Sequence, residues 1–217
     1  MPVHRERTLV NSGTGVIDTV LFDYGGVIAE EGFRGGLYAI AQLNGLDAEA
    51  FYQQVNRTIA DCGYLTGCVD EASFWNNVRQ ACGIRQTDEQ LRDELLRRFV
   101  LRPGMLAAVS RLRRSGLRVG MISDQTNWLD ELDRRDGFFA CFDSIFNSYH
   151  VHASKYQGDL FNAVAGQLHT APEKILIVDD NAGNIEKARQ RGFAAILYEN
   201  EPGFLREMLH FFPDIFG

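Results

Sequence analysis

Long apolar runs, an excess of basic residues and paired cysteine motifs are all missing from this sequence of 217 residues. No apolar stretch approaches the ~20 residues that a helix needs to cross a bilayer, so no membrane span is expected. Acidic residues number 29 against 22 basic ones, a net charge of −7, which excludes the basic stripe of a typical nucleic-acid binder. The 4 cysteines show no C-x-x-C spacing, so neither zinc sites nor disulfides are expected. A small charged molecule is a better candidate for the partner.

The first segment of the chain, residues 1–15, mixes charged residues with Asn, Ser and Gly and has no apolar run like that of a signal peptide. A flexible tail is expected there. Without an export signal, the reducing cytoplasm is the expected location. The sequence does not predict the oligomeric state.

Five short apolar runs have the length and composition of buried strands. They lie at residues 16–22, 117–122, 144–147, 175–178 and 194–198, with helical patterns between the later ones. This alternation predicts an α/β fold with a Rossmann-like, doubly wound parallel sheet, in which ligands bind beyond the carboxyl ends of the strands.

Roughly ninety residues without a strand pattern separate the first two predicted strands, far more than one crossover helix needs. Helix starts are predicted within them at Asp47, at Asp70 and at Thr87, where Gln90 completes a capping box. We therefore expect a core made of residues 16–30 and 104–217, with an inserted helical cap at residues 31–103.

Asp23 ends the first predicted strand and is followed by Tyr24, Gly25 and Gly26. Small residues at such a strand end leave backbone N–H groups free to face an anion. Asp23 is thus a candidate nucleophile in a phosphate cradle that includes Tyr24 and Gly25. An isolated D-x-G-G is more often a capped turn, so this interpretation depends on residues further along the chain.

Three further residues predict a phosphate site. Ser123 and Asp124 end the second strand, and Lys155 follows the third in a polar loop. A hydroxyl beside Asp23 suits a phosphoryl oxygen, and a compact ammonium suits a phosphate and a carboxylate together. Taken alone, Ser123 is more typical of a helix cap and Lys155 of a surface lysine.

The adjacent carboxylates Asp179 and Asp180 follow the fourth strand, with Asn184 close behind. Neighbouring carboxylates repel one another, and a hard cation bound through oxygen relieves the repulsion. The pair predicts a magnesium site more strongly than a solvated turn.

Taken in order, these motifs resemble the haloacid dehalogenase superfamily over nearly all of residues 16–200. The insert then looks like the helical cap that covers the active site in that superfamily. The glycine-bearing loop, Asp179-Asp180-Asn181 and Asn184 also resemble its sugar-phosphate branch, which includes glucose-1-phosphate phosphatases.

The resemblance implies a phosphatase that acts on a small phosphorylated metabolite through an aspartyl-phosphate on Asp23. It implies Mg²⁺ held by Asp23, the carbonyl of Gly25 and Asp180, with Asp179 as a further or water-mediated ligand. Ser123 and Lys155 would hold the phosphoryl group, with Tyr24, Gly25 and Asp124 beside it and Asn184 in support. For the cap, Arg34 and Tyr64 are the first candidates for specificity.

The sequence departs from the pattern at three positions. Gly25 stands where the common D-x-D motif has its acid/base Asp, Asp124 where many relatives have Asn, and Tyr156 where Pro is common. Loss of general acid catalysis costs about 10²- to 10⁴-fold in rate. A sugar 1-phosphate, whose anomeric leaving oxygen is less basic, needs less help from an acid. Two alternatives stay open: a non-catalytic or weakly active binding protein, and a metal-free 2-haloacid dehalogenase.

Overall fold

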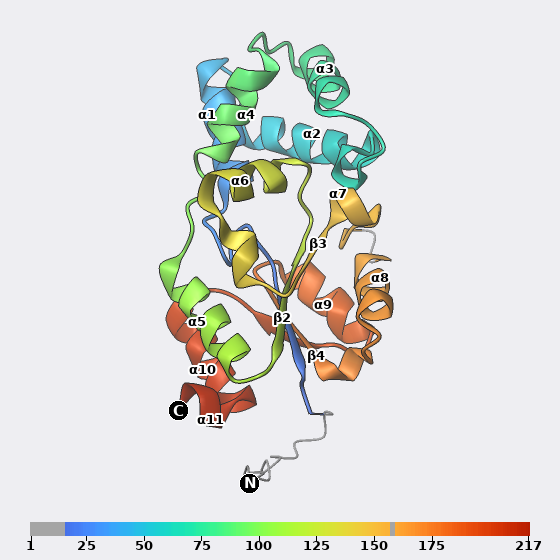
Figure 1. The fold of residues 1–217 in the computed structure, drawn as a ribbon. Coiled ribbons are helices and arrows are strands. Elements are labelled where there is room, and N and C mark those ends of the chain that lie inside the picture. The colour runs from blue at the N-terminus through green and yellow to red at the C-terminus, as the bar shows by residue number, and fades with distance from the viewer. Residues whose placement is uncertain (1–15, 157–158) are drawn as a thin grey trace, which may run out of the picture.

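The computed structural model describes residues 16–156 and 159–217, so the predicted tail at 1–15 lies outside the described residues. Its strands form one parallel sheet in the order β3-β2-β1-β4-β5 (Figure 1). The strands are β1 (Thr19–Phe22), β2 (Arg118–Ser123), β3 (Ser144–Asn147), β4 (Ile175–Asp179) and β5 (Ala194–Leu197). The predicted doubly wound α/β sheet is confirmed. The first strand begins three residues later than predicted, because Val16 lies before the ladder with half of its surface exposed.

Alternate residues of each strand face opposite helical layers. In β1, Val20 and Phe22 join one hydrophobic cluster, whereas Leu21 joins the other. The first cluster is covered by α5 (Pro103–Arg114), α6 (Trp128–Asp136) and α10 (Glu201–Phe211), and the second by α8 (Asp159–Leu168) and α9 (Ala182–Gln190). The short helices α7 (Ser148–Val151) and α11 (Pro213–Phe216) complete the core. Helices on both faces bury the sheet and leave its carboxyl edge as the place for a site.

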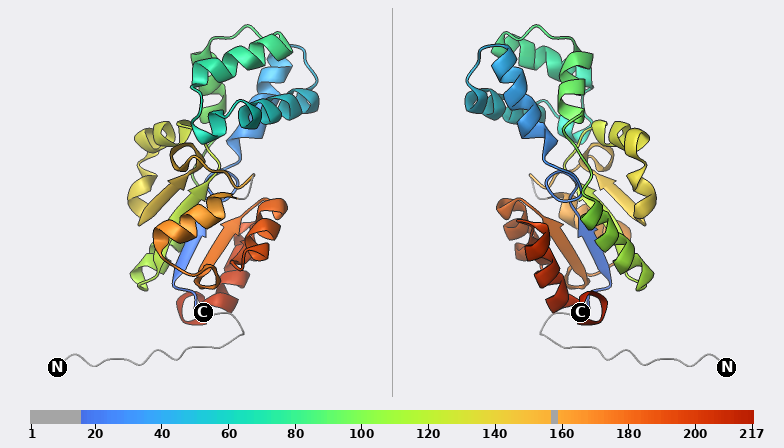
Figure 2. Two further views of the ribbon diagram at one scale, coloured as in Figure 1. Left: turned by 90° about the vertical axis from the view of Figure 1, so that its right-hand side faces the viewer. Right: turned by 90° about the vertical axis from the view of Figure 1, so that its left-hand side faces the viewer.

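Four helices between β1 and α5 form a separate lobe over the carboxyl ends of the strands (Figure 2). They are α1 (Gly32–Leu43), α2 (Ala48–Asp61), α3 (Glu71–Cys82) and α4 (Asp88–Leu96). All lie within the residues expected to form the cap. The side chains of Asp47 and Asp70 cap α2 and α3, and Thr87 with Gln90 forms the predicted capping box of α4.

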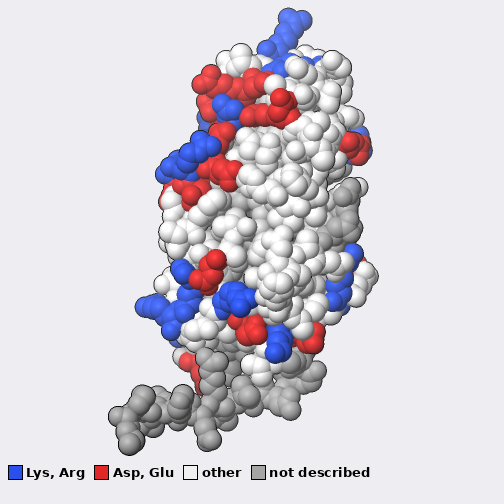
Figure 3. All heavy atoms as spheres, turned by 45° about the vertical axis from the view of Figure 1, so that its right-hand side comes forward, with Lys and Arg blue, Asp and Glu red and all other residues white. Residues whose placement is uncertain are grey.

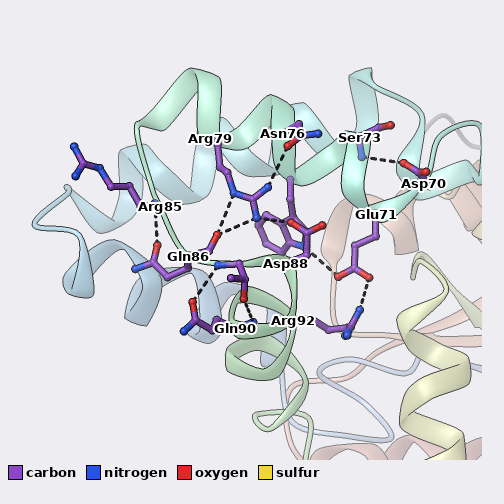
Figure 4. A network of polar contacts seen from close by, with 12 residues as sticks. Asp70, Glu71, Ser73, Asn76, Arg79, Arg85, Gln86, Asp88, Gln90 and Arg92 are labelled. Atoms are coloured by element: carbon purple, nitrogen blue, oxygen red, sulfur yellow. Dashed lines mark hydrogen bonds and ion pairs between the residues drawn. The ribbon is translucent and has the colours of Figure 1, made fainter.

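A polar network ties α3 to α4 across their short connection (Figure 4). The Arg79 guanidinium pairs with Asp88 and donates to the carbonyl of Gln86 over 3.0 and 2.9 Å. Glu71 accepts from Trp75 Nε1 at 3.1 Å and pairs with Arg92 at 2.8 Å. These contacts fix the two helices that close the cap's own hydrophobic cluster.

The cap is docked on the core through α6. Trp128 of α6 is buried within the cap cluster, and Arg92 of α4 approaches Glu131 of α6 at 3.3 Å. The hydroxyl of Tyr64, in the short helix η1 (Tyr64–Thr66), donates to Asn127 at 2.6 Å. Tyr64 is fully buried and does not line the cavity described below, so it packs the joint and does not face a substrate.

Charges of both signs stand side by side on the face drawn in Figure 3, over the cap and again at the lower end of the core. Among the described residues, no helix is both long enough and apolar enough to span a bilayer.

Candidate active site

The predicted motifs meet at the carboxyl edge of the sheet, beneath the cap. A cavity of about 700 Å³ lies there. The predicted residues that line it are Asp23, Gly25, Ser123, Asp124, Lys155, Asp180 and Asn184. A larger and more open depression of about 1070 Å³ lies at the opposite edge, around Arg113 and Arg118, and contains none of the motif residues. The smaller cavity is therefore the candidate active site.

Lys155 is a buried cation between two carboxylates. Its Nζ lies 2.9 Å from Oδ1 of Asp23 and 2.6 Å from Oδ2 of Asp179, and its side chain is only 1% exposed. Burial alone would lower the pKa of Lys155, but the charges of Asp179 and Asp23 reverse this and hold the pKa above its usual range. Lys155 is thus a fixed positive charge beside the candidate nucleophile.

Asp23, Asp179 and Asp180 bring their carboxylates together. One oxygen from each lies within 4.8 Å of the others. Burial and then the charge of Asp179 raise the pKa of Asp180 to about 6. Burial also raises the pKa of Asp23, where the Lys155 charge opposes it and the charges of Asp179 and Asp180 add to it. Three oxygen ligands under mutual repulsion fit a hard divalent cation.

The three carboxylates differ in how many partners they already have. Asp179 is fully buried and accepts from Lys155, from the N–H of Asn181 at 2.8 Å and from Asn184 Nδ2 at 3.2 Å. Asp180 lies at the solvent-exposed end of the group. Asp23 and Asp180 therefore have more capacity for a cation, whereas Asp179 anchors Lys155. The supporting role predicted for Asn184 corresponds to its bond with Asp179.

Gly26 lets Asp180 approach the first motif. Its φ is +79°, and a Cβ built on it would overlap the carboxylate of Asp180. Any larger residue would both strain the backbone and displace this carboxylate. The two glycines after Asp23 are the sequence feature that could have predicted this close approach of Asp180. The sequence analysis assigned Gly26 only a backbone N–H facing an anion.

Tyr24 and Asp124 differ from their predicted phosphate-binding roles. The Tyr24 ring is buried against Phe99 and Phe138, with centroids 5.7 and 4.8 Å away, and its N–H donates to Asp23 Oδ1 at 2.7 Å. The Tyr24 side chain therefore points into the core. Asp124 lines the cavity, but its carboxylate accepts two backbone N–H groups of the Lys155 loop. A carboxylate so placed holds the loop and not an anion.

The cap and α9 complete the lining of the cavity, and of their residues Arg34, Asn181 and Asn184 belong to the predictions, whereas the others were not predicted. The cap contributes Phe33, Tyr52 and Asn56, together with Arg34, whose guanidinium stacks on Tyr52 at 4.9 Å and pairs with Glu49 at 2.9 Å. In the core, Asn181, Asn184 and Lys187 line the cavity at a spacing of three residues along α9. That helical spacing was the signal that could have identified Lys187 from the sequence.

The sequence model that describes the family of haloacid dehalogenase-like hydrolases matches residues 17–192 of this chain. The chain belongs to this family. The predicted superfamily is therefore confirmed, and the chain is a hydrolase by membership.

Solved structures of this family share the fold at low sequence identity. A HAD family enzyme from Bacteroides thetaiotaomicron has a TM-score of 0.69 at 20% identity, covering 84% of this chain and 93% of that one. The same enzyme in complex with magnesium and inorganic phosphate has a TM-score of 0.63 at 18% identity, with 83% and 93% coverage. L-2-haloacid dehalogenase from Xanthobacter autotrophicus has a TM-score of 0.61 at 18% identity, with 89% and 83% coverage.

Curated relatives match only part of the chain. Bifunctional epoxide hydrolase 2 of Mus musculus is 30% identical over 118 residues, which are 51% of this chain and 21% of that protein. Drimenol cyclase drtB of Aspergillus calidoustus is 32% identical over 71 residues, 33% of this chain and 13% of that protein. The matched part is thus a small fraction of each relative.

Proposed function

We propose that this hydrolase is a Mg²⁺-dependent phosphatase that cleaves a small phosphate ester, with a sugar phosphate favoured, through an aspartyl-phosphate on Asp23. The observation that carries the proposal is the group formed by Asp23, Asp179 and Asp180, with one oxygen from each within 4.8 Å. A metal-free attack on carbon has no use for three repelling carboxylates, whereas a phosphatase uses a cation there.

The contacts of Asp23 favour one of its oxygens as the attacking atom. Oδ1 accepts from Lys155 and from the N–H of Tyr24. Within the described residues, Oδ2 takes part in no hydrogen bond, which leaves it free to attack phosphorus. The bond from Oδ2 to phosphorus forms as the bond from phosphorus to the leaving oxygen breaks, and the leaving oxygen takes up a proton from solvent water. Water then attacks phosphorus, releases phosphate and regenerates Asp23.

The other residues of the site bind the phosphoryl group and neutralise its negative charge. Ser123 and Lys155 line the cavity beside Asp23, where a hydroxyl and a fixed ammonium suit phosphoryl oxygens. A bound Mg²⁺, held by Asp23, Asp180 and the carbonyl of Gly25, would supply positive charge to the phosphoryl oxygens. The magnesium complex of the B. thetaiotaomicron enzyme supports this choice of ion.

Gly25 restricts the substrate. It offers no acid to protonate the leaving oxygen, so esters with a less basic leaving oxygen, such as an anomeric one, should react best. The expected substrate is a phosphorylated metabolite in the cytoplasm, and neither a nucleic acid nor a membrane is expected as a partner.

Two assays, each run with and without Mg²⁺, test the proposal: phosphate release from anomeric sugar phosphates, primary-alcohol sugar phosphates and an aryl phosphate, and halide release from a 2-haloacid. Asp130→Asn is the matched control for Asp23→Asn, because Asp130 pairs with His150 away from the cavity. We expect Mg²⁺-dependent release by the wild type and Asp130→Asn and none by Asp23→Asn. Halide release without metal would replace the proposal with the dehalogenase, and no turnover of any compound would replace it with a binding protein. Hydrolysis of primary-alcohol phosphates as fast as anomeric ones would remove the argument from Gly25.

A further inference from the structure

The backbone that carries Lys155 is held by a charged side chain on its N–H side. Oδ1 of Asp124 accepts the N–H of Lys155 at 2.8 Å, and Oδ2 accepts the N–H of Tyr156 at 3.1 Å. Both oxygens of one carboxylate are thus used on two consecutive N–H groups. Tyr156 is 65% exposed, and its ring contacts Lys187, whose Nζ lies 5.4 Å from the ring centroid; Asp124 is bonded by the N–H of Tyr156 and not by its ring.

A second charged side chain holds the same two residues on their carbonyl side. The ammonium of Lys187 donates to the carbonyl of Tyr156 at 2.7 Å and to that of Lys155 at 3.3 Å. It comes from α9, whereas Asp124 follows β2. The backbone of Lys155 and Tyr156 is therefore held by residues from two elements, and the sheet fixes the positions of these elements relative to each other.

We propose that Asp124 and Lys187 are positioning residues that clamp the backbone of Lys155 and Tyr156, and that Asp124 and the N–H of Tyr156 are a matched pair. The clamp places the Lys155 ammonium between Asp23 and Asp179, so it rests on the proposed function for its effect on turnover. A single interaction then accounts for two of the departures from the family pattern, Asp124 and Tyr156.

The matching follows from counting donors and acceptors. A carboxylate offers an acceptor to each of two N–H groups, whereas the amide of asparagine offers one oxygen and one NH₂ group. With Asp124→Asn, the NH₂ group meets one of the two N–H groups, and where this is the N–H of Tyr156 that donor loses its partner. Tyr156→Pro removes that N–H, so in the double variant the amide oxygen accepts the remaining N–H of Lys155 and no backbone N–H faces the NH₂ group.

A double-mutant cycle tests the pair. It compares the wild type, Asp124→Asn, Tyr156→Pro and the double variant by kcat and KM for an aryl phosphate with Mg²⁺. Tyr156→Ala is the control that removes the ring, and with it the contact to Lys187, but keeps the N–H that Asp124 accepts. Each single variant of the cycle is expected to lose about tenfold or more in kcat, since one hydrogen bond fewer then holds the backbone that carries Lys155. The double variant is expected to recover at least about fivefold over the product of the two losses, with KM little changed.

Hydrogen exchange of the Lys155 and Tyr156 amides in the metal-free protein reads the clamp without any turnover. Both amides should exchange slowly in the wild type and at least about tenfold faster in Asp124→Asn, an effect on the order of one lost hydrogen bond. If the wild type hydrolyses no ester but this difference is found, the proposed function fails and the clamp stands. Equal exchange rates in the wild type and Asp124→Asn would overturn the clamp. Losses in kcat that simply multiply in the double variant would overturn it as well, because backbone strain introduced by proline, unlike an unmatched N–H, cannot be relieved by asparagine at position 124.

Discussion

The ammonium of Lys155 lies 2.6 Å from Oδ2 of Asp179, in an ion pair whose side chains are 1% and 0% exposed. Asp179 does not line the cavity. Its other acceptor sites receive hydrogen bonds from the N–H of Asn181 and from Nδ2 of Asn184. The pair therefore fixes the position of the cation that neutralises Asp23.

Replacing Lys155 by Met should destabilise the protein strongly. The change leaves the buried carboxylates of Asp179 and Asp23 without their cation, and breaking a buried pair costs about 3–5 kcal/mol. The loss should be larger at pH 8 than at pH 5, because burial raises the pKa of Asp23 and this carboxylate can take up a proton at low pH. Urea unfolding at both pH values measures it. Lys174→Met, at an exposed lysine, is the control. A loss of stability independent of pH would contradict the ion-pair account.

Gly26→Ala should weaken metal binding as well as stability. The residue has φ +79°, and a Cβ would overlap the carboxylate of Asp180. Gly45→Ala is a matched control, since Gly45 has φ +66° but open space around its Cβ position. Both variants should lose about 1 kcal/mol from backbone strain. Only Gly26→Ala should also raise the Mg²⁺ concentration needed for half-maximal thermal stabilisation. Equal Mg²⁺ dependence in the two variants would show that Asp180 is not a ligand.

The meeting of the motif residues at one edge of the sheet was predictable, because strand ends and acidic motifs are local features. Asp23 directly follows β1, and Ser123 and Asp179 end β2 and β4; parallel strands place their carboxyl ends together. The helix starts at Asp47, Asp70 and Thr87 were predictable for the same reason, since a cap depends on neighbours a few residues away.

The partners of the motif residues were not predictable, because they depend on contacts between distant segments. The clamp joins Asp124 to the Lys155 loop 31 and 32 residues away, and Lys187 reaches the same loop from the other side. Tyr64 was a plausible substrate contact only because it is an aromatic residue in the predicted cap. Its burial at the joint with Asn127 follows from how the cap docks, which no local pattern contains.

Metal-free protein should be more stable at mildly acidic pH than at neutral pH. The pKa of Asp180 rises from 3.8 to about 6 on folding, so the folded state binds more protons than the unfolded chain between these values. The free energy of unfolding therefore falls as pH rises through this window. Solvent screening keeps the effect small, because Asp180 is partly exposed.

Mg²⁺ should reverse that trend, since it binds the charged carboxylates of the folded state. At a concentration about 100 times its Kd, it should raise Tm by about 5 °C or more near pH 7.5 and much less near pH 5. Calorimetry with and without Mg²⁺ at both pH values checks the trend, with Asp180→Asn as the variant that should lose it. A Tm that rises steadily from pH 4 to 7 without metal would contradict the assigned repulsion.

Gly25→Asp should supply the acid that the first motif lacks. No positive φ constrains Gly25, and a Cβ there would lie 3.3 Å from Cε1 of Phe99, so the ring must shift by a few tenths of an ångström. Because an acid matters most for a basic leaving oxygen, we expect kcat for a primary alkyl phosphate to rise by about 10- to 100-fold relative to an aryl phosphate. Gly25→Asn has the same size without the acid and should show no such gain. Phe99→Leu, added to both variants, removes the steric conflict and separates a crowded site from an ineffective acid. If Asp and Asn at position 25 behave alike in that wider site, the leaving oxygen is protonated by another group, and the preference for anomeric phosphates no longer follows from Gly25.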